Sequence, residues 1–255
     1  MSDHAAAYGL VTEFDPFARI EADTFALADA AEGRLAEPVP TCPGWSVADL
    51  LWHLQEVQRF WAAVVAGRVQ DPTEVPEAVR PADDAELVPG LRSGVAQIVS
   101  ALRSAGPHEP CWTWSSRKDA GFVVRHQVHE AAVHRWDCEH AAGRETPLDP
   151  AAAADGVEEF LQVSTPFPLE DAAPLGGRLE LVATDVGLRW AVEEDDAGVA
   201  HWRRLTAPAT DAAAVLRGSA ADLLLYLYKR RRAGELDVTG DRDVAERFAQ
   251  RTSTD

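Results

Sequence analysis

Apolar residues recur at helical spacing through the first 145 residues of the chain. Four stretches place apolar side chains three or four positions apart, the spacing of one helix face: 10–33, 46–67, 91–102 and 119–142. Ser46, followed three residues later by Asp49, is a capping-box-like start for the second stretch. Four helices of roughly twenty residues joined by loops predict an antiparallel four-helix bundle over residues 1–145.

The pattern changes to one of short strands after residue 150. Leu188, Trp190 and Val192 alternate with residues that favour the opposite face, which is typical of a half-buried strand. Strands are expected at 178–185, 188–195, 200–205, 212–216 and 235–238, and helices at 150–163, 219–232 and 241–251. Strands mixed with helices predict a small α+β domain over residues 150–255.

Composition narrows the classes of partner and the compartment. The 255 residues carry a formal net charge of −18, which would repel nucleic acid and anionic membrane surfaces. No apolar run is long enough to span a bilayer, and the first residues lack the features of an export signal. The three cysteines are widely separated and odd in number. They fit reduced thiols, so we expect a cytoplasmic protein.

Histidines are concentrated in the fourth predicted helix. His126, Glu130 and His134 stand four residues apart, and each step of about 400° shifts the direction by only about 40°, so they share one face. Glu130 and His134 are therefore placed to bind one metal ion together. A zinc-protease motif is excluded because Val133 stands where its second histidine is needed.

A catalytic zinc ion usually takes three protein ligands, so a third should come from a facing helix. His53 is the best candidate because it borders the apolar face of the second predicted helix. Two simpler interpretations stay open from the residues alone. His53 could be a hydrogen-bonded core histidine, and Glu130 with His134 could belong to a solvated helix face.

Other polar and aromatic residues are weaker candidates for a role in the predicted site. His126 and His129 are expected on the surface or beside the ligands, and Asp137 could orient His134. Cys42 lies in a predicted turn and is expected to be structural, while Cys138 is not expected to bind metal. Trp112 and Trp114 precede the fourth helix and are expected to be buried, although they could line the mouth of a cleft.

Two segments of the chain resemble a known family. The stretch VPTCPGWSVADLLWHL at 39–54, followed by HEAAVHRWD at 129–137, resembles the mycothiol-dependent maleylpyruvate isomerase family. Residues 217–232 and 236–248 are similar to its C-terminal domain, so the resemblance covers about 8–250. It implies a DinB-like bundle followed by a smaller domain related in shape to sterol-carrier domains.

The resemblance also implies a chemistry. It implies a divalent metal, expected to be zinc, on His53, Glu130 and His134, and mycothiol as a thiol cofactor that fills the open metal position. A metal-bound thiolate could then isomerise a small electrophilic substrate or be transferred to it. An arginine that contacts a substrate carboxylate falls on Arg230, with Arg231 as the neighbouring choice.

Alternative functions remain compatible with the same residues. A zinc-bound water could act as the nucleophile of a hydrolase, or the chain could be a non-catalytic protein that binds a small molecule or lipid. The basic run Lys229–Arg232 could simply favour the end of the 219–232 helix. Both a monomer and a homodimer are compatible with the sequence.

Overall fold

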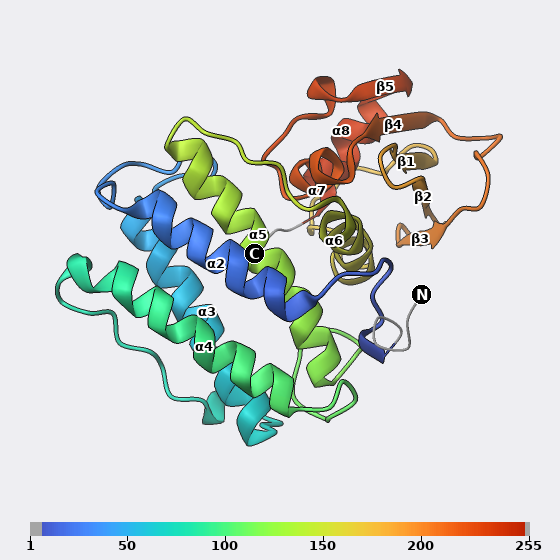
Figure 1. Cartoon of the computed structure of the whole chain (residues 1–255). Helices are drawn as coiled ribbons and strands as arrows, with labels where there is room; N and C mark the ends of the chain where they lie inside the picture. The colour runs from blue at the N-terminus through green and yellow to red at the C-terminus, as the bar shows by residue number, and fades with distance from the viewer. Residues whose placement is uncertain (1–6, 253–255) are drawn as a thin grey trace. The chain divides into compact units, whose positions relative to one another are not determined.

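The computed structural model of the protein describes residues 7–252, and the chain divides into two compact units after Leu148 (Figure 1). The first unit is helical, and the second combines helices with a five-stranded sheet. This is the fold class that the hydrophobic pattern predicts. Within 7–252, no helix has both the length and the apolar character needed to cross a bilayer.

Four long helices build the first unit: α2 (Pro16–Ala31), α3 (Val47–Gly67), α4 (Leu87–Ser104) and α5 (Ala120–Ala141). α2 packs mainly against α5, and α3 packs mainly against α4 (Figure 1). The predicted capping box forms at α3, where Ser46 and Asp49 each bind the other's backbone N–H. Asp15 and Asp119 cap α2 and α5 with their carboxylates.

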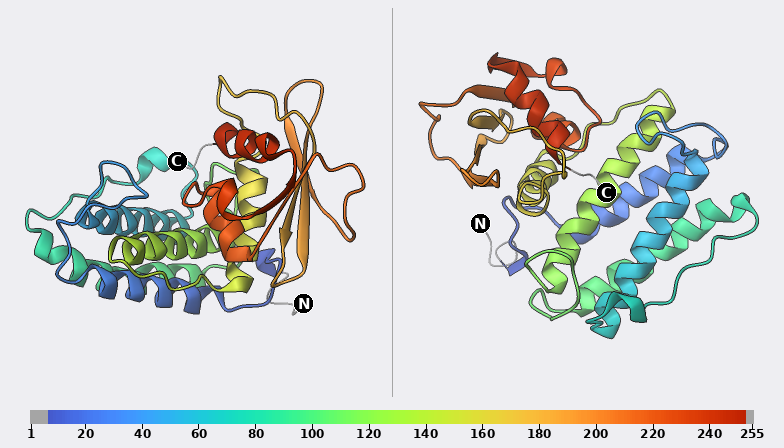
Figure 2. Two further views of the ribbon diagram at one scale, coloured as in Figure 1. Left: turned by 90° about the horizontal axis from the view of Figure 1, so that it is seen from above. Right: turned by 180° about the vertical axis from the view of Figure 1, so that it is seen from behind.

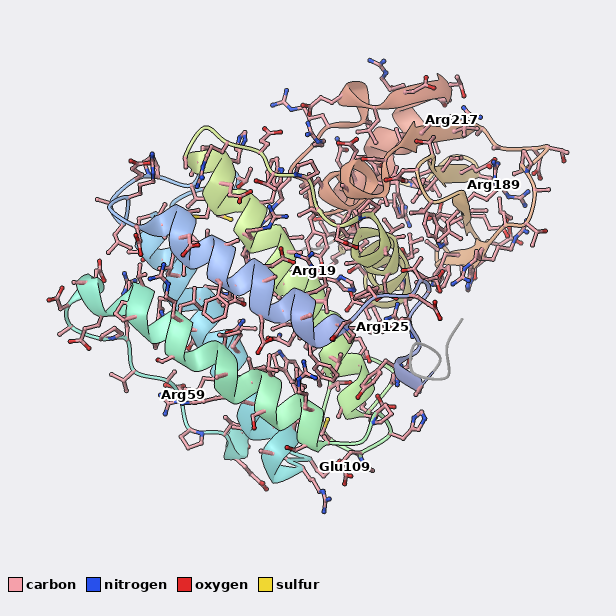
Figure 3. The ribbon with its side chains drawn as sticks, viewed as in Figure 1. Arg19, Arg59, Glu109, Arg125, Arg189 and Arg217 are labelled. Carbon is pink, nitrogen blue, oxygen red and sulfur yellow. The ribbon has the colours of Figure 1, made fainter. Side chains whose placement is uncertain are left out.

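A group of buried charges joins α2 to α5. The Arg135 Nε atom on α5 lies 2.9 Å from Asp23 Oδ1 on α2, and Arg135 Nη1 lies 2.7 Å from Glu139 Oε2. Arg19, labelled on α2 in Figure 3, pairs with the same Asp23 oxygen at 2.9 Å. Because each buried charge meets an opposite one, α5 can carry polar residues and still be buried along most of its length.

The second unit begins with α6 (Pro150–Val163) and is built on a mixed sheet. Its strands are β1 (Leu179–Ala183), β2 (Leu188–Glu194), β3 (Ala200–Arg204), β4 (Ala214–Gly218) and β5 (Asp237–Gly240), in the order β3-β2-β1-β4-β5. β1 runs parallel to β4 and antiparallel to β2, where Leu181 faces Trp190. The helices α7 (Ala220–Leu227) and α8 (Arg242–Arg251) lie on one face of the sheet (Figure 2).

Several predicted boundaries are wrong by a few residues. The helix expected over 219–232 ends at Leu227, because the chain turns sharply where Lys229 adopts a left-handed backbone conformation with φ of 62°. The basic run after it is therefore not the last turn of a helix. The final strand is Asp237–Gly240 rather than 235–238, because a 3-10 turn occupies Ala233–Glu235. The helix expected over 10–33 is α2, which Asp15 caps and which begins at Pro16 and ends at Ala31.

Candidate metal centre

Two helices of the bundle bring His53, Glu130 and His134 together. His53 lies in the second turn of α3, and the other two lie one turn apart on α5. The side chain of His53 is 33% exposed and that of Glu130 is 17% exposed. The group is therefore partly shielded but still open to a ligand on the His53 side.

The ligand atoms are close enough to share one ion. Nε2 of His53 lies 3.6 Å and Nε2 of His134 lies 3.5 Å from the same Glu130 oxygen, Oε2. Ligands about 2.1 Å from a tetrahedral zinc ion stand roughly 3.4 Å apart. Oε2 of Glu130 is also buried and accepts no hydrogen bond from the described residues. A cation would satisfy this oxygen, so the residues fit a divalent metal.

The electrostatics of Glu130 and His134 favour the charged form of each. Burial alone would raise the pKa of Glu130, but its contacts with His134 and His53 outweigh burial and hold the pKa well below its usual range. Burial would lower the pKa of His134, but Asp137 and Glu130 raise it to about 9. A metal ion would therefore have to displace a proton from His134.

Asp137 holds the ligand histidine from behind. Its Oδ2 atom lies 3.1 Å from His134 Nδ1, the ring nitrogen that points away from Glu130. Thr41 Oγ1 donates to Asp137 Oδ1 at 2.6 Å, and Cys42 Sγ donates to Oδ2 at 3.7 Å. A carboxylate in this position fixes the tautomer and orientation of a metal-binding imidazole.

Cys42, His134 and Asp137 form a second group with metal-ligand spacing. The two groups share His134 but use opposite ring nitrogens. Both Asp137 oxygens already accept hydrogen bonds from the loop before α3, whereas Glu130 Oε2 accepts none from the described residues. The unsatisfied oxygen therefore favours the group with His53 and Glu130 as the metal centre.

The remaining histidines and cysteines of α5 have different surroundings. Neither His126 nor His129 is on the surface: His126 Nε2 lies 3.5 Å from Glu130 Oε1, and His129 is buried. The contact of His126 follows from its i, i+4 spacing, which the sequence already displays. Cys138 Sγ donates to Leu27 O at 3.9 Å. Burial and the nearby Glu139 raise the pKa of Cys138 to about 12, which makes this thiol a poor nucleophile.

Aromatic rings surround the trio. The Trp45 ring centroid lies 5.0 Å from that of His53 and 6.4 Å from that of His134. Trp114 is 46% exposed, contrary to the expectation that it is buried, and packs against His126. The Trp45 ring packs against two of the proposed ligands, and apolar surroundings of this kind strengthen electrostatic interactions.

Arg230 lies in the second unit, in the turn that follows α7. Its Nη1 atom donates to Tyr228 O at 2.8 Å. The Arg231 Nε atom lies 2.9 Å from Asp222 Oδ1, and Arg231 lines a cavity of about 530 Å³ together with Lys229 and Arg232. The role of Arg230 in substrate binding stays a prediction.

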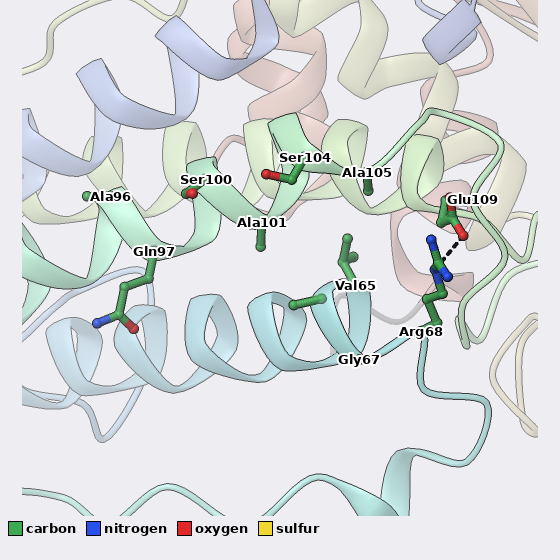
Figure 4. Close-up of a pocket in the computed structure, with 11 residues that line it drawn as sticks. Val65, Gly67, Arg68, Ala96, Gln97, Ser100, Ala101, Ser104, Ala105 and Glu109 are labelled. Atoms are coloured by element: carbon green, nitrogen blue, oxygen red, sulfur yellow. Dashed lines mark ion pairs between the residues drawn. The ribbon is translucent and has the colours of Figure 1, made fainter.

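A larger hollow of about 790 Å³ lies between the ends of α3 and α4 (Figure 4). Small side chains such as Ala101 and Ser104 line it, and Arg68 pairs with Glu109 at its edge. No histidine or cysteine is among the residues that line it. This hollow lacks the chemistry of the metal centre.

The helical first unit matches a known protein family. Residues 17–139 match the family described as mycothiol maleylpyruvate isomerase N-terminal domain. The matched range contains all three residues of the predicted trio. No curated protein matches the sequence.

Two solved structures share the fold of most of the chain. A mycothiol-dependent maleylpyruvate isomerase aligns with a TM-score of 0.51, and a variant of that enzyme with a histidine replaced by alanine aligns with a TM-score of 0.57. In both cases 14% of residues are identical, and the alignment covers 88% of this chain and 91% of the other. At this identity the likeness establishes the fold.

Proposed function

We propose that the chain is a metal- and mycothiol-dependent enzyme, because residues 17–139 match the family described as mycothiol maleylpyruvate isomerase N-terminal domain. Its reaction would be isomerisation, or transfer of the thiol, on a small electrophilic molecule. The observation that carries the proposal is the buried Glu130 Oε2, which faces two imidazoles at 3.5 and 3.6 Å and accepts no hydrogen bond from the described residues.

Each residue of the centre has a separate task in this proposal. His53, Glu130 and His134 would hold a divalent metal, with zinc the favoured ion, and three protein ligands would leave room for a thiol on it. A bound metal supplies one effect, which is to lower the pKa of a coordinated thiol so that the thiolate forms near neutral pH. Glu130 contributes the negative charge, and Asp137 keeps His134 in the tautomer whose Nε2 faces the metal.

The substrate contact belongs to the second domain in this proposal. We take the bundle as residues 1–145 and the second domain as residues 150–255. A guanidinium group can bind a carboxylate through two parallel hydrogen bonds. We assign this task to Arg230, with Arg231 as the neighbouring choice, because the family resemblance of residues 217–232 places the arginine nearest to Arg230. An electrophile that carries a carboxylate, such as a maleylpyruvate-like molecule, would suit this arginine.

Metal analysis of protein purified without chelators tests the ligand assignment. We expect about one zinc ion per wild-type chain and far less in His53→Ala, because only two ligands remain. His140→Ala is the matched control, because His140 lies on α5 but pairs with Glu145 instead. Stoichiometric zinc that persists in His53→Ala would contradict the assignment.

A second measurement separates the proposed chemistry from hydrolysis by a metal-bound water. The metal-loaded protein is incubated with mycothiol and a maleylpyruvate-like electrophile, and the products are identified by mass spectrometry. A trans isomer or a thiol adduct supports the proposal. A hydrolysed product that forms equally well without thiol would favour a hydrolase.

A further inference from the structure

Trp114 is partly exposed to solvent and packs against His126, a neighbour of the metal centre. Its side chain is 46% exposed, and its ring centroid lies 4.7 Å from that of His126, 5.3 Å from that of Trp61 and 5.5 Å from that of Phe122. Large aromatic side chains usually bury most of their surface. An exposed tryptophan that three rings hold in place is therefore a candidate contact for a ligand.

His126 links this tryptophan to the metal centre. Its ring meets the Trp114 ring edge to face at an interplanar angle of 84°, and its Nε2 atom lies 3.5 Å from Glu130 Oε1. His126 and Glu130 are four residues apart on α5, which corresponds to about 6 Å along the helix axis. A ligand that is anchored at the metal and extends one helical turn along α5 would reach Trp114.

The loop that carries Trp114 is fixed on both sides of the ring. Thr113 and Ser115 are buried, and their hydroxyl groups donate to the Arg117 carbonyl oxygen at 2.8 and 3.0 Å. The Arg117 guanidinium donates to Asp119, the residue that caps α5, at 2.9 Å. A surface that is already ordered loses little conformational entropy when a ligand binds.

We propose that the exposed part of the Trp114 ring binds a sugar ring of the thiol cofactor, an inference that rests on the proposed function. Mycothiol joins its cysteine thiol through an amide to a glucosamine–inositol pair. Each of these rings has C–H groups that can stack on an indole and hydroxyl groups that remain in water. The half-exposed Trp114 offers both environments at once.

The charge of the protein favours the same ligand. The chain carries a formal net charge of −18, so an anionic extension of the cofactor would be repelled. The sugar and inositol rings are neutral and need no basic side chain. In this proposal Trp114 binds the neutral rings of the cofactor, while the metal centre binds its sulfur.

Calorimetric titration of the metal-loaded protein tests the inference with two thiols. Mycothiol carries both rings, and N-acetylcysteine carries the same thiol without them. In Trp114→Ala we expect mycothiol to bind about tenfold more weakly, as for the loss of one ring-stacking contact, and N-acetylcysteine to bind as in the wild type. Trp114→Phe, which keeps a smaller ring, should restore part of the affinity.

Controls distinguish the inference from general damage. Phe25 on α2 is 43% exposed, and Phe25→Ala should leave both affinities unchanged. Metal content should stay at the wild-type value in all variants. Equal affinity of Trp114→Ala and wild type for mycothiol, or an equal loss for both thiols, would overturn the sugar contact and leave the proposed function standing. Failure of mycothiol to bind the metal-loaded wild type would overturn both.

Discussion

Glu130 connects three histidines because its two oxygens face different neighbours. Oε2 faces His53 and His134, while Oε1 faces His126. A carboxylate that binds a metal through one oxygen can accept a hydrogen bond on the other, which fixes its orientation. The geometry of the centre thus depends on groups that do not touch the ion.

Asp137 offers a direct test of that dependence. Asp137→Asn removes the negative charge that faces His134 Nδ1 at 3.1 Å, and we expect zinc affinity to fall about 10- to 100-fold. Competition with a chromophoric chelator measures the affinity. Thr41→Val, which removes only the hydrogen bond to Asp137 Oδ1, should have a smaller effect. Unchanged affinity in Asp137→Asn would show that His134 needs no support from this carboxylate.

Some residues of the centre follow from sequence, and others require the fold. Glu130 and His134 are four residues apart on one helix, and helical geometry alone places them on one face. The contact of Thr41 with Asp137 joins residues 96 positions apart in the chain. No local pattern encodes it, because it depends on where the loop before α3 lies against α5.

At the scale of elements, α2 and α5 depend on the buried charges between them. Arg135 and Asp23 are each only 4% exposed. Burial raises the pKa of Asp23, although Arg135 and Arg19 oppose this effect. The pair therefore stabilises the helix contact only while both partners are present.

Arg135→Met should destabilise the protein strongly. The change leaves the buried Glu139 without its arginine and leaves Asp23 with Arg19 alone, and a buried charge that loses its partner costs about 3–5 kcal/mol. Chemical denaturation measures the free energy of unfolding. Arg34→Met is the control, because Arg34 and Glu37 are 41% and 42% exposed, and an exposed pair contributes about 0–1 kcal/mol. Similar losses in both variants would contradict the importance of burial.

The start of α3 gives a pH-dependent prediction. Hydrogen bonds from Arg80 and Ser46 lower the pKa of Asp49 to about 2, below the value of about 3.9 in an unfolded chain. The stability from this carboxylate is therefore present above about pH 4 and declines as the pH falls toward 2. Asp49 is partly exposed, so we expect Asp49→Ala to cost about 1 kcal/mol near neutral pH.

Thermal unfolding of the wild type and of Asp49→Ala between pH 3 and 7 tests this pH dependence. The difference between wild type and Asp49→Ala should shrink as the pH is lowered. A difference that stays constant down to pH 3 would mean that the loss comes from packing rather than from the charged cap.

Element boundaries are harder to predict than the elements themselves. Residues 219–232 contain neither glycine nor proline. The sequence therefore has no local signal that would end the helix at Leu227. The end depends on the left-handed conformation of Lys229, which non-glycine residues adopt only when tertiary contacts require it. The start of α3 was predictable because Ser46 and Asp49 form a local motif.

At the scale of the whole molecule, metal removal should reveal which unit depends on the ion. All three proposed ligands belong to the first unit, and a ligand that binds only the folded state stabilises it by about 2.7 kcal/mol at one hundred times its dissociation constant. Calorimetry with and without a chelator should show a lower Tm for the unfolding of the bundle. An unchanged Tm would favour the non-catalytic binding protein.

The order of the strands has a consequence for how the second unit forms. β1 pairs with β2 across a short turn, but its parallel partner β4 begins only at Ala214, after β2 and β3 have been passed. Closing such a long loop costs entropy before any pairing is gained. The hairpin of β1 and β2 can therefore fold early on the ribosome, while the sheet acquires its central parallel pair late, which makes that step the natural kinetic bottleneck of the unit.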